Sequence, residues 1–199
     1  MPESCMADLT SRAPGFCTLE VDDWQDVEEL EDICFRPPLS RDQIKSMLKP
    51  ASMYVWYGLR TGPEGWGSLP SGKVAAYVCS VMPADVAQIV RFGCLPAVRR
   101  QGLGSLLMLN YLQVATINLM RVVQLEVKPG NRQAVHMYEN LGFERIGCRP
   151  RYYENGEAAL LYNLLDLQTP VVQARLAARL DRTRARFVNS ISAGGKNHG

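Results

Sequence analysis

Two hydrophobic patterns divide this chain into predicted strands and predicted helices. Stretches rich in β-branched and aromatic side chains, bounded by Gly, Pro or Ser, are typical of strands. The first half of the chain contains four such stretches, at residues 16–21, 53–60, 73–82 and 86–95. Gly, Pro and Ser fill the connection between the second and the third, which predicts a hairpin with a long turn. We therefore expect antiparallel neighbours in this part of the sheet.

Apolar side chains that recur every three or four residues predict the helices. The segments with helical character are 22–35, 40–49, 103–120 and 131–141. Pro37 and Pro38 end the first of them, and Ser40 with Gln43 forms a capping box that starts the second. Gly142 closes the fourth. A broken helical pair is thus expected early in the chain, and two separate helices later.

The remaining apolar stretches, 122–127, 143–149 and 159–165, predict three more strands. The elements then follow in the order strand, two helices, three strands, helix, strand, helix and two strands. This order predicts an α/β fold with a mixed, mostly antiparallel sheet of about seven strands and four flanking helices. A doubly wound parallel sheet would instead require strands and helices to alternate throughout.

The length of 199 residues favours one domain with short extensions. We expect a flexible leader at residues 1–15, the domain at 16–168, an amphipathic helix at 169–189 and a disordered tail at 190–199. Thr169 and Pro170 have the side chains that start a helix. Within it Val172, Leu176 and Leu180 repeat every four residues, opposite the basic residues Arg175, Arg179, Arg182, Arg184 and Arg186.

Composition narrows the class of protein. The 22 basic and 20 acidic side chains give a net charge of only +2, so direct nucleic-acid binding is not expected. The chain has no apolar run long enough for a membrane span and no targeting segment at its start, which favours a cytoplasmic protein. The six cysteines contain no Cys-x-x-Cys pair, and we expect buried free thiols and no metal site: Cys5, Cys17, Cys34, Cys79, Cys94 and Cys148.

A glycine-rich turn between a strand and a helix is the most informative motif. The turn has the residues Arg99, Arg100, Gln101, Gly102, Leu103, Gly104 and Ser105. Glycines let a backbone approach a diphosphate closely, and the free N–H groups at the start of a helix bind its oxygens. The arginines add positive charge, and the Ser105 hydroxyl adds a donor. The alternative is a basic turn that caps a helix and binds nothing.

The motif and several later positions resemble one enzyme family. Residues 95–107, LPAVRRQGLGSLL, resemble the acetyl-coenzyme A signature of the GCN5-related N-acetyltransferases. The likeness continues through Asn131, the segment 141–143 and the segment 151–157, RYYENGE, as in the branch that acetylates the N-termini of proteins, especially the bacterial ribosomal-protein alanine acetyltransferases. The resemblance implies that acetyl-CoA binds along the main chain of Phe92 and Cys94, at residues 99–105 and at Asn131.

Transfer of an acetyl group to an amine needs a proton acceptor, because only the neutral amine attacks a thioester. Glu126 lies in an apolar strand and points away from Leu125 and Val127, where desolvation makes a carboxylate a stronger base. Most isolated glutamates on strands are simply solvated. The family has its proposed base at the matching position, so the resemblance assigns the general base to Glu126, directly or through a water.

The departing thiolate of coenzyme A benefits from a proton donor. Tyr138 shares a helix face with Ala134 and Leu141, which on its own is typical of an ordinary core tyrosine. The resemblance implies that Tyr138 is the general acid. His136 is expected on another face of the helix, in solvent, and Cys94 lacks the basic partner that a nucleophile needs.

The resemblance also implies where the acceptor amine enters. A peptide N-terminus is expected to enter between two segments. One contains Phe35 and Pro37, near the break in the helical pair, and the other is the turn that carries Tyr152 and Tyr153. Phe35 and Pro37 equally fit a simple helix stop. Eukaryotic N-terminal relatives often have tyrosines where this chain has Leu39 and Gln88, so their specificity does not transfer.

Two alternatives remain open at this stage. Members with similar motifs acetylate lysines or small amines, because the signature reports the cofactor rather than the acceptor. The chain could also be an acyl-CoA-binding module that contacts a partner through its basic C-terminal helix; such a helix is more typically a solvated amphipathic face than a nucleic-acid site.

Overall fold

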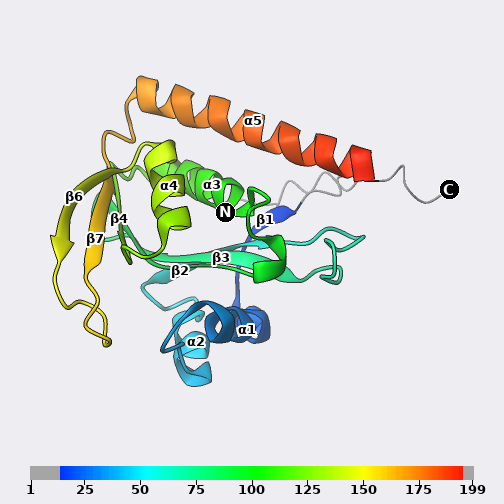
Figure 1. Ribbon diagram of the computed structural model, residues 1–199, viewed down its shortest axis with the longest axis horizontal. Coiled ribbons are helices and arrows are strands. Elements are labelled where there is room, and N and C mark those ends of the chain that lie inside the picture. The colour runs from blue at the N-terminus through cyan, green and yellow to red at the C-terminus, as the bar shows by residue number, and fades with distance from the viewer. Residues whose placement is uncertain (1–13, 195–199) are drawn as a thin grey trace.

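A mixed seven-stranded sheet forms the middle layer of the protein (Figure 1). The computed structural model describes residues 14–194, so most of the predicted leader, Cys5 and the last five residues of the predicted tail lie outside the described residues. The strands lie in the order β1-β2-β3-β4-β5-β7-β6. Neighbours are antiparallel except for β4 and β5, which are parallel. The antiparallel first half expected from the sequence is confirmed.

The elements agree with the predicted order. The strands are β1 (Gly15–Thr18), β2 (Tyr54–Arg60), β3 (Val74–Val81), β4 (Val86–Cys94), β5 (Val122–Val127), β6 (Glu144–Arg149) and β7 (Ala159–Leu164). The helices are α1 (Trp24–Cys34), α2 (Arg41–Met47), α3 (Leu103–Ile117), α4 (Arg132–Leu141) and α5 (Pro170–Gly194), with short 3-10 turns η1 (Val21–Asp23) and η2 (Pro96–Val98). The predicted sheet of seven strands, four flanking helices and extra C-terminal helix is confirmed.

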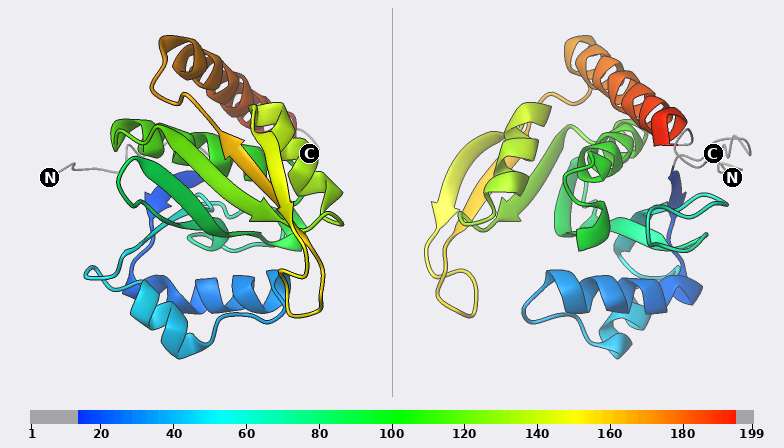
Figure 2. Two further views of the ribbon diagram at one scale, coloured as in Figure 1. Left: turned by 90° about the vertical axis from the view of Figure 1, so that its left-hand side faces the viewer. Right: turned by 45° about the vertical axis from the view of Figure 1, so that its right-hand side comes forward.

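Helices cover both faces of the sheet. α1 and α2 lie on one face, while α3 and α4 lie on the other and α5 runs across α3 (Figures 1 and 2). β3 is buried at every position from Val74 to Ser80, because helices pack on both of its faces. The strands nearer the β6 edge lack a helix on the α1 side, so their polar side chains there reach solvent.

Local sequence signals fix the helix ends as expected. Ser40 and Gln43 form the predicted capping box, in which the Gln43 N–H donates to the Ser40 hydroxyl. The Asn131 carboxamide oxygen caps α4 by accepting from the Ala134 N–H at 3.3 Å. Gly142 ends α4 with φ of 94°, a conformation that glycine adopts without strain.

The parallel pair β4 and β5 separates along its length. Pairing runs from Val86 and Val122 to Ile89 and Leu125 and then stops, although β4 continues to Cys94. A bulge in β4 interrupts its register with β3 between Ile89 and Arg91, and bulges bend strands. The carboxyl ends of two parallel strands therefore leave an opening beside the start of α3, which is where α/β folds commonly bind ligands.

The C-terminal helix is longer than predicted. α5 extends to Gly194 rather than ending near Asn189, so the start of the predicted disordered tail is helical. Its basic face is exposed, as expected, but two of its arginines also contact the domain: Arg184 donates to the Asn110 carboxamide of α3 at 2.7 Å, and Arg175 lies against Gly142. The guanidinium of Arg184 thus reaches a buried amide, as the long aliphatic part of an arginine side chain allows.

No two cysteines within residues 14–194 form a disulfide with each other. Cys79 is buried and Cys17, Cys34 and Cys94 are partly buried, but Cys148 is exposed because it lies on the edge strand β6. Within residues 14–194 no helix combines the length and the apolar character that crossing a lipid bilayer requires.

Candidate active site

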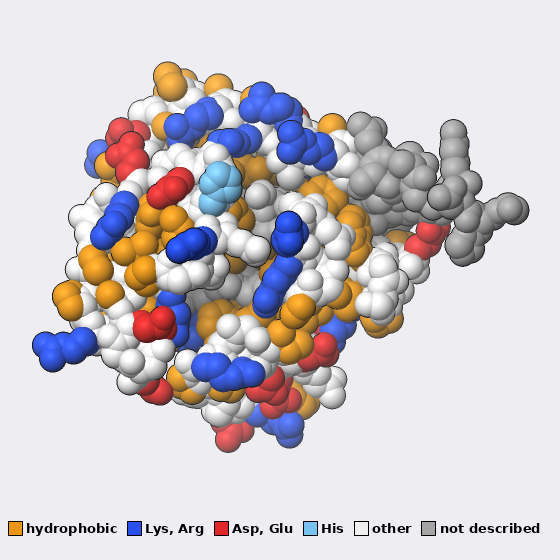
Figure 3. Space-filling model, in the orientation of Figure 1, with side chains coloured by type: hydrophobic (Ala, Val, Ile, Leu, Met, Phe, Trp, Pro, Cys, Tyr) orange, Lys and Arg blue, Asp and Glu red, His pale blue; other side chains and the backbone are white. Residues whose placement is uncertain are grey.

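The glycine-rich turn lies at the opening between β4 and β5. Arg100 and Gly102 adopt φ of 62° and 90°, and α3 begins directly afterwards at Leu103. The first N–H groups of a helix have no partner within it, and here they point out of the turn with the positive end of the helix dipole. In Figure 3, basic side chains surround a hollow between this turn and α4. The turn thus has the geometry of an anion site, and residues 99–105 are called the phosphate loop below.

The side chains of the phosphate loop divide into two groups. Arg99 donates to the Cys94 carbonyl at 2.8 Å and contacts the Cys34 sulfur at 3.4 Å. Gln101 donates to the Ala97 carbonyl at 2.9 Å. The side chains of Arg99 and Gln101 therefore stabilise the turn by hydrogen bonding to the main chain that precedes it. Arg100 is exposed and makes no hydrogen bond or ion pair within residues 14–194, so its guanidinium is available to a ligand.

The edge of β4 that faces the opening carries Phe92 and Cys94. These residues pair with β3 through Val78 and Ala76, but β5 does not pair with them. A strand edge without a neighbour binds an extended amide group through its main chain. The Cys94 carbonyl already accepts from Arg99, so Phe92 offers the freer main-chain groups. The Cys94 thiol is not activated, because burial raises its pKa to about 11.

Glu126 lies on β5 with the predicted orientation, since Leu125 and Val127 are buried on the opposite face. Its side chain is 17% exposed, and its carboxylate accepts from Arg149 of β6 at 2.7 Å. Hydrogen bonding to Glu126 is the main cause that raises the pKa of Tyr152. The carboxylate is therefore held between a guanidinium and a phenol, rather than in purely apolar surroundings.

Tyr138 reaches the same region from α4. It is 5% exposed and packs edge to face against Phe92, with ring centroids 6.3 Å apart, and against Phe143 at 5.7 Å. Burial raises its pKa well above the usual value near 10, and Tyr153 adds to the effect. The phenol therefore stays protonated at neutral pH.

Tyr153 links the two predicted catalytic residues. Burial, helped by the charge of Glu126, raises the pKa of Tyr153 to about 12, and Tyr153 in turn acts on Tyr138. Tyr152 and Tyr153 pack edge to face at 5.1 Å, and both N–H groups donate to the Glu157 carbonyl. Their loop thus places Tyr152 and Tyr153 within electrostatic range of Glu126, and Tyr153 within range of Tyr138.

A polar groove extends from Glu126 over the face of the sheet that α1 and α2 leave uncovered. Its volume is about 190 Å³, and its lining comes from β4, β5, β6 and β7: Gln88, Gln124, Leu125, Glu126, Ile146, Arg149, Leu161 and Asn163. The β6–β7 loop and the α1–α2 pair project from this same side of the sheet (Figures 1 and 2). Glu126 and its partner Arg149 therefore both line this groove.

The predicted wall formed by Phe35 and Pro37 lies at the end of α1. The Arg91 guanidinium stacks over the Phe35 ring at 4.7 Å, and the ring lies beside Gly93 of β4. Phe35 thus lies close to the opening, while Pro37 is exposed. His136 is exposed, as predicted.

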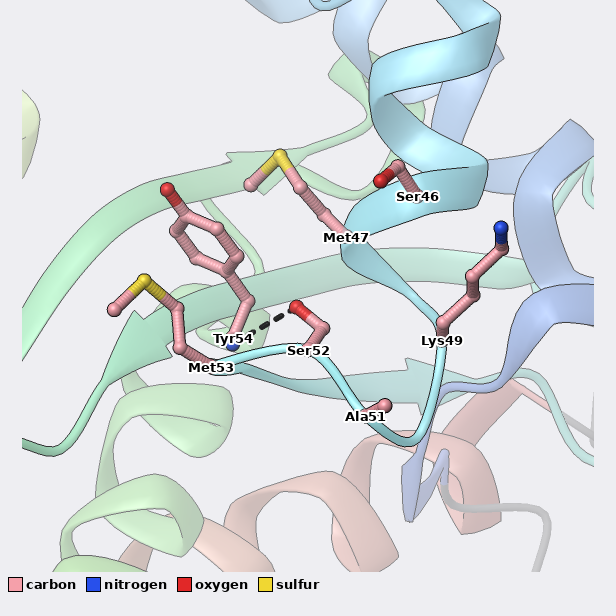
Figure 4. A pocket seen from close by; sticks show the side chains of 7 residues that line it. All are labelled: Ser46, Met47, Lys49, Ala51, Ser52, Met53 and Tyr54. Atoms are coloured by element: carbon pink, nitrogen blue, oxygen red, sulfur yellow. Dashed lines mark hydrogen bonds between the residues drawn. The ribbon is translucent and has the colours of Figure 1, made fainter.

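A larger depression of about 340 Å³ lies elsewhere, between the end of α2 and the start of β2 (Figure 4). Met47, Met53 and Tyr54 flank it, with Ser46, Lys49 and Ser52 at its rim. It contains none of the predicted site residues. Volume alone therefore does not identify the functional site in this fold.

Comparison with known families agrees with this geometry. Residues 24–143, more than half of the chain, match the model of the acetyltransferase (GNAT) family. The chain belongs to the GNAT family. The match contains the phosphate loop, Glu126 and Tyr138, and it ends before the β6–β7 loop and α5.

Similar GNAT proteins include enzymes named as ribosomal-protein alanine N-acetyltransferases. The ribosomal protein bS18-alanine N-acetyltransferase of Escherichia coli strain K12 is 31% identical over 83 residues, which are 42% of this chain and 56% of that protein. This chain therefore matches about half the length of that relative. The crystal structure of the ribosomal-protein-S18-alanine N-acetyltransferase from Escherichia coli has a TM-score of 0.64 and 25% identity, and the alignment covers 77% of this chain and 94% of that one.

A second solved structure contains the cofactor. Arabidopsis thaliana NAA60 in complex with acetyl-CoA has a TM-score of 0.65 over 76% of this chain and 98% of that one, with 14% identity. At that identity the likeness concerns the fold alone. The same architecture thus accommodates acetyl-CoA in another protein.

Sequence reasoning missed two features of this structure. Arg149 pairs with Glu126 from a strand that is remote in sequence, and nothing in its local pattern reveals this. Glu31 is fully buried in α1, where it binds the Tyr77 hydroxyl and, at 2.8 Å, the Leu39 N–H. Its place on the apolar face of a helix, one residue after Leu30, was the available signal for a buried carboxylate.

Proposed function

We propose that this GNAT protein transfers the acetyl group of acetyl-CoA directly to the N-terminal α-amino group of a protein or peptide. The observation that carries the proposal is the convergence of Glu126, Tyr138 and Tyr153 at the point where β4 and β5 separate, beside the start of α3. A base, an acid and an anion site at one opening are the groups that acetyl transfer to an amine needs.

The residues around the opening fit acetyl-CoA. The start of α3, with Gly102, Leu103, Gly104 and Ser105, offers N–H groups to the pyrophosphate, and Arg100 offers an unpaired guanidinium. Arg99 and Gln101 support this turn from within.

The pantetheine arm lies, in this proposal, along the free edge of β4 at Phe92 and Cys94, where its amides complete the strand pairing that β5 leaves unmade. The Asn131 oxygen caps α4, which leaves its amide nitrogen for the arm. When bound, acetyl-CoA supplies an activated acetyl thioester.

The polar groove receives the acceptor. Its lining comes from β4, β5, β6 and β7, and the β6–β7 loop with Tyr152 and Tyr153 and the α1–α2 segment with Phe35 and Pro37 project from the same side of the sheet. An open groove that ends at Glu126 suits the first residues of an extended chain better than a lysine side chain, which needs a deeper channel. The bacterial relatives named as ribosomal-protein alanine N-acetyltransferases support an amine of a protein as the acceptor.

Glu126 acts as the general base. An α-amino group, with a pKa of about 7.7 to 8.0, must lose a proton before its lone pair attacks the acetyl carbon. The carboxylate accepts that proton, directly or through one water. Arg149 orients the carboxylate and stays near enough to compensate its charge.

Tyr138 acts as the general acid. As the new C–N bond forms and the C–S bond breaks, negative charge develops on the sulfur. The phenol of Tyr138 donates its hydrogen to that sulfur, and its raised pKa keeps the hydrogen in place until then. No residue of the chain becomes acylated, which agrees with the buried and unactivated thiol of Cys94.

Coenzyme A release with a panel of amines tests the proposal. The panel contains short peptides with free N-termini, polyamines, and lysine peptides whose N-termini are already acetylated. We expect turnover with the free N-terminal peptides, above all those with small first residues. Turnover confined to blocked lysine peptides or polyamines contradicts the acceptor class, and binding of acetyl-CoA without turnover of any amine contradicts catalysis.

A further inference from the structure

We infer that α5 and the β2–β3 connection brace the phosphate loop, with Phe187 and Trp66 as positioning residues for acetyl-CoA binding. Three segments far apart in the sequence meet at this point: Trp66, residues 101–102 and Phe187. The inference rests on the proposed role of the loop in binding the pyrophosphate. It assigns a purpose to α5, which lies outside the part of the chain that matches the GNAT model.

Phe187 packs directly on the bare backbone of the loop. Its side chain is 4% exposed, and its ring atoms lie 3.4 and 3.5 Å from the position that a Cβ of Gly102 would take. Gly102 has φ of 90°, which residues with a side chain rarely adopt. The missing side chain thus serves two purposes here: it permits the turn and it leaves room for the ring.

Trp66 holds the same turn from the β2–β3 connection. Its indole N–H donates to the Gln101 carboxamide at 2.8 Å, and its ring packs edge to face on Phe187 with centroids 5.5 Å apart. The amide nitrogen of Gln101 donates in turn to the Ala97 carbonyl. Trp66 is itself fixed by two main-chain hydrogen bonds with Leu69, each 2.9 Å long. The Trp66 hydrogen bond therefore restrains Gln101, while the Phe187 ring that Trp66 supports restrains Gly102.

α5 is fixed to the helix whose first turn faces the phosphates. Leu180 is buried against the domain, and Arg184 donates to the buried Asn110 of α3. Motion of Phe187 relative to α3 is thereby limited. Glycine residues make an unsupported loop conformationally permissive, and a loop held in its binding conformation loses less entropy when the ligand binds.

Calorimetric titration of the full chain with acetyl-CoA tests the brace. We expect Phe187→Ala to weaken binding about tenfold, which corresponds to about 1.4 kcal/mol. Trp66→Phe keeps the ring but loses the hydrogen bond to Gln101, and we expect a loss of about threefold, smaller than for Phe187→Ala. Phe187→Leu, which restores most of the packing, should recover most of the affinity. The KM for acetyl-CoA should rise in parallel, while kcat and the KM for the acceptor stay within about twofold.

Leu180→Ala is the matched control, because it removes buried packing from the same helix without touching the loop. It should lower the melting temperature at least as much as Phe187→Ala while leaving acetyl-CoA affinity unchanged. Equal affinity losses in both variants, or none in Phe187→Ala and Trp66→Phe, overturn the inference. Arg100→Gln separates this result from the proposed function: if it binds acetyl-CoA normally, the phosphate site itself is misassigned, whereas a loss there with normal binding in Phe187→Ala contradicts only the brace.

Discussion

The Glu126 carboxylate is the residue on which the proposed chemistry depends most. It is largely buried, oriented by Arg149 and adjacent to Tyr152 at the end of the polar groove. Glu126→Gln keeps the shape of the side chain but removes the proton acceptor. We expect kcat to fall about 10²- to 10⁴-fold, the usual contribution of a general base, with acetyl-CoA affinity nearly unchanged. Rate and affinity are measured by coenzyme A release and by titration.

Glu144→Gln is the control for Glu126→Gln. Glu144 is an exposed glutamate at the start of β6, and its amide variant should retain full activity. Wild-type rates in Glu126→Gln across the pH range would remove this residue as the base.

Tyr138 makes a prediction about pH. Its pKa is raised by burial, and a phenol is protonated below its pKa, so it can donate its hydrogen throughout neutral and mildly alkaline solution. We expect kcat to show no decline up to about pH 10, where an unperturbed tyrosine would titrate. A pH profile of kcat over the range in which the protein stays folded checks this. An alkaline decline centred well below pH 10 in the wild type, absent from Tyr138→Phe, would contradict the shifted phenol.

The junction between α1 and the sheet depends on one buried carboxylate. Glu31 binds the Tyr77 hydroxyl and the Leu39 N–H, and Arg91 lies 3.8 Å away. Glu31→Ala leaves these partners buried without their hydrogen-bond acceptor, and we expect the free energy of unfolding to fall by about 3 to 5 kcal/mol. Urea unfolding measures it. Glu31→Gln, which keeps the shape and one acceptor, should lose less; an unfolding free energy for Glu31→Ala equal to wild type would exclude a structural role for the network.

The phosphate loop makes a prediction at the level of an element. Gly102→Val forces a β-branched residue into φ of 90° and against the Phe187 ring, so we expect acetyl-CoA binding to weaken at least about tenfold. Gly130→Ala is the control, since a Cβ there meets nothing within 4 Å. Titration compares the two variants. Normal affinity in Gly102→Val would contradict the account of the loop.

At the scale of the whole molecule, the sequence predicted what local patterns encode. The capping box at Ser40, the stop at Gly142 and the strand-to-helix glycine turn are short-range signals, and the structure confirms each. The order of the elements then predicted the mixed sheet. These features need no knowledge of distant contacts.

Features that depend on distant contacts were not predictable. The ion pair between Glu126 and Arg149 joins two strands that lie on either side of β7 in the sheet, and the packing of Phe187 on Gly102 joins residues 85 positions apart. The end of α5 was placed too early because the residues after 189 have low helix propensity. The hydrogen bond from the exposed Arg184 to Asn110 could not be predicted either, because a pattern of arginines does not show which of them reaches a buried amide.

The central claim is that the acetyl group goes to an N-terminal α-amine. The most direct test uses one peptide that starts with alanine and also carries an internal lysine, so that both amines compete in the same reaction. After incubation with acetyl-CoA, fragmentation in a mass spectrometer locates the added acetyl group. The account predicts acetylation of the α-amine with the lysine left free. Acetyl groups on the lysine alone would contradict it.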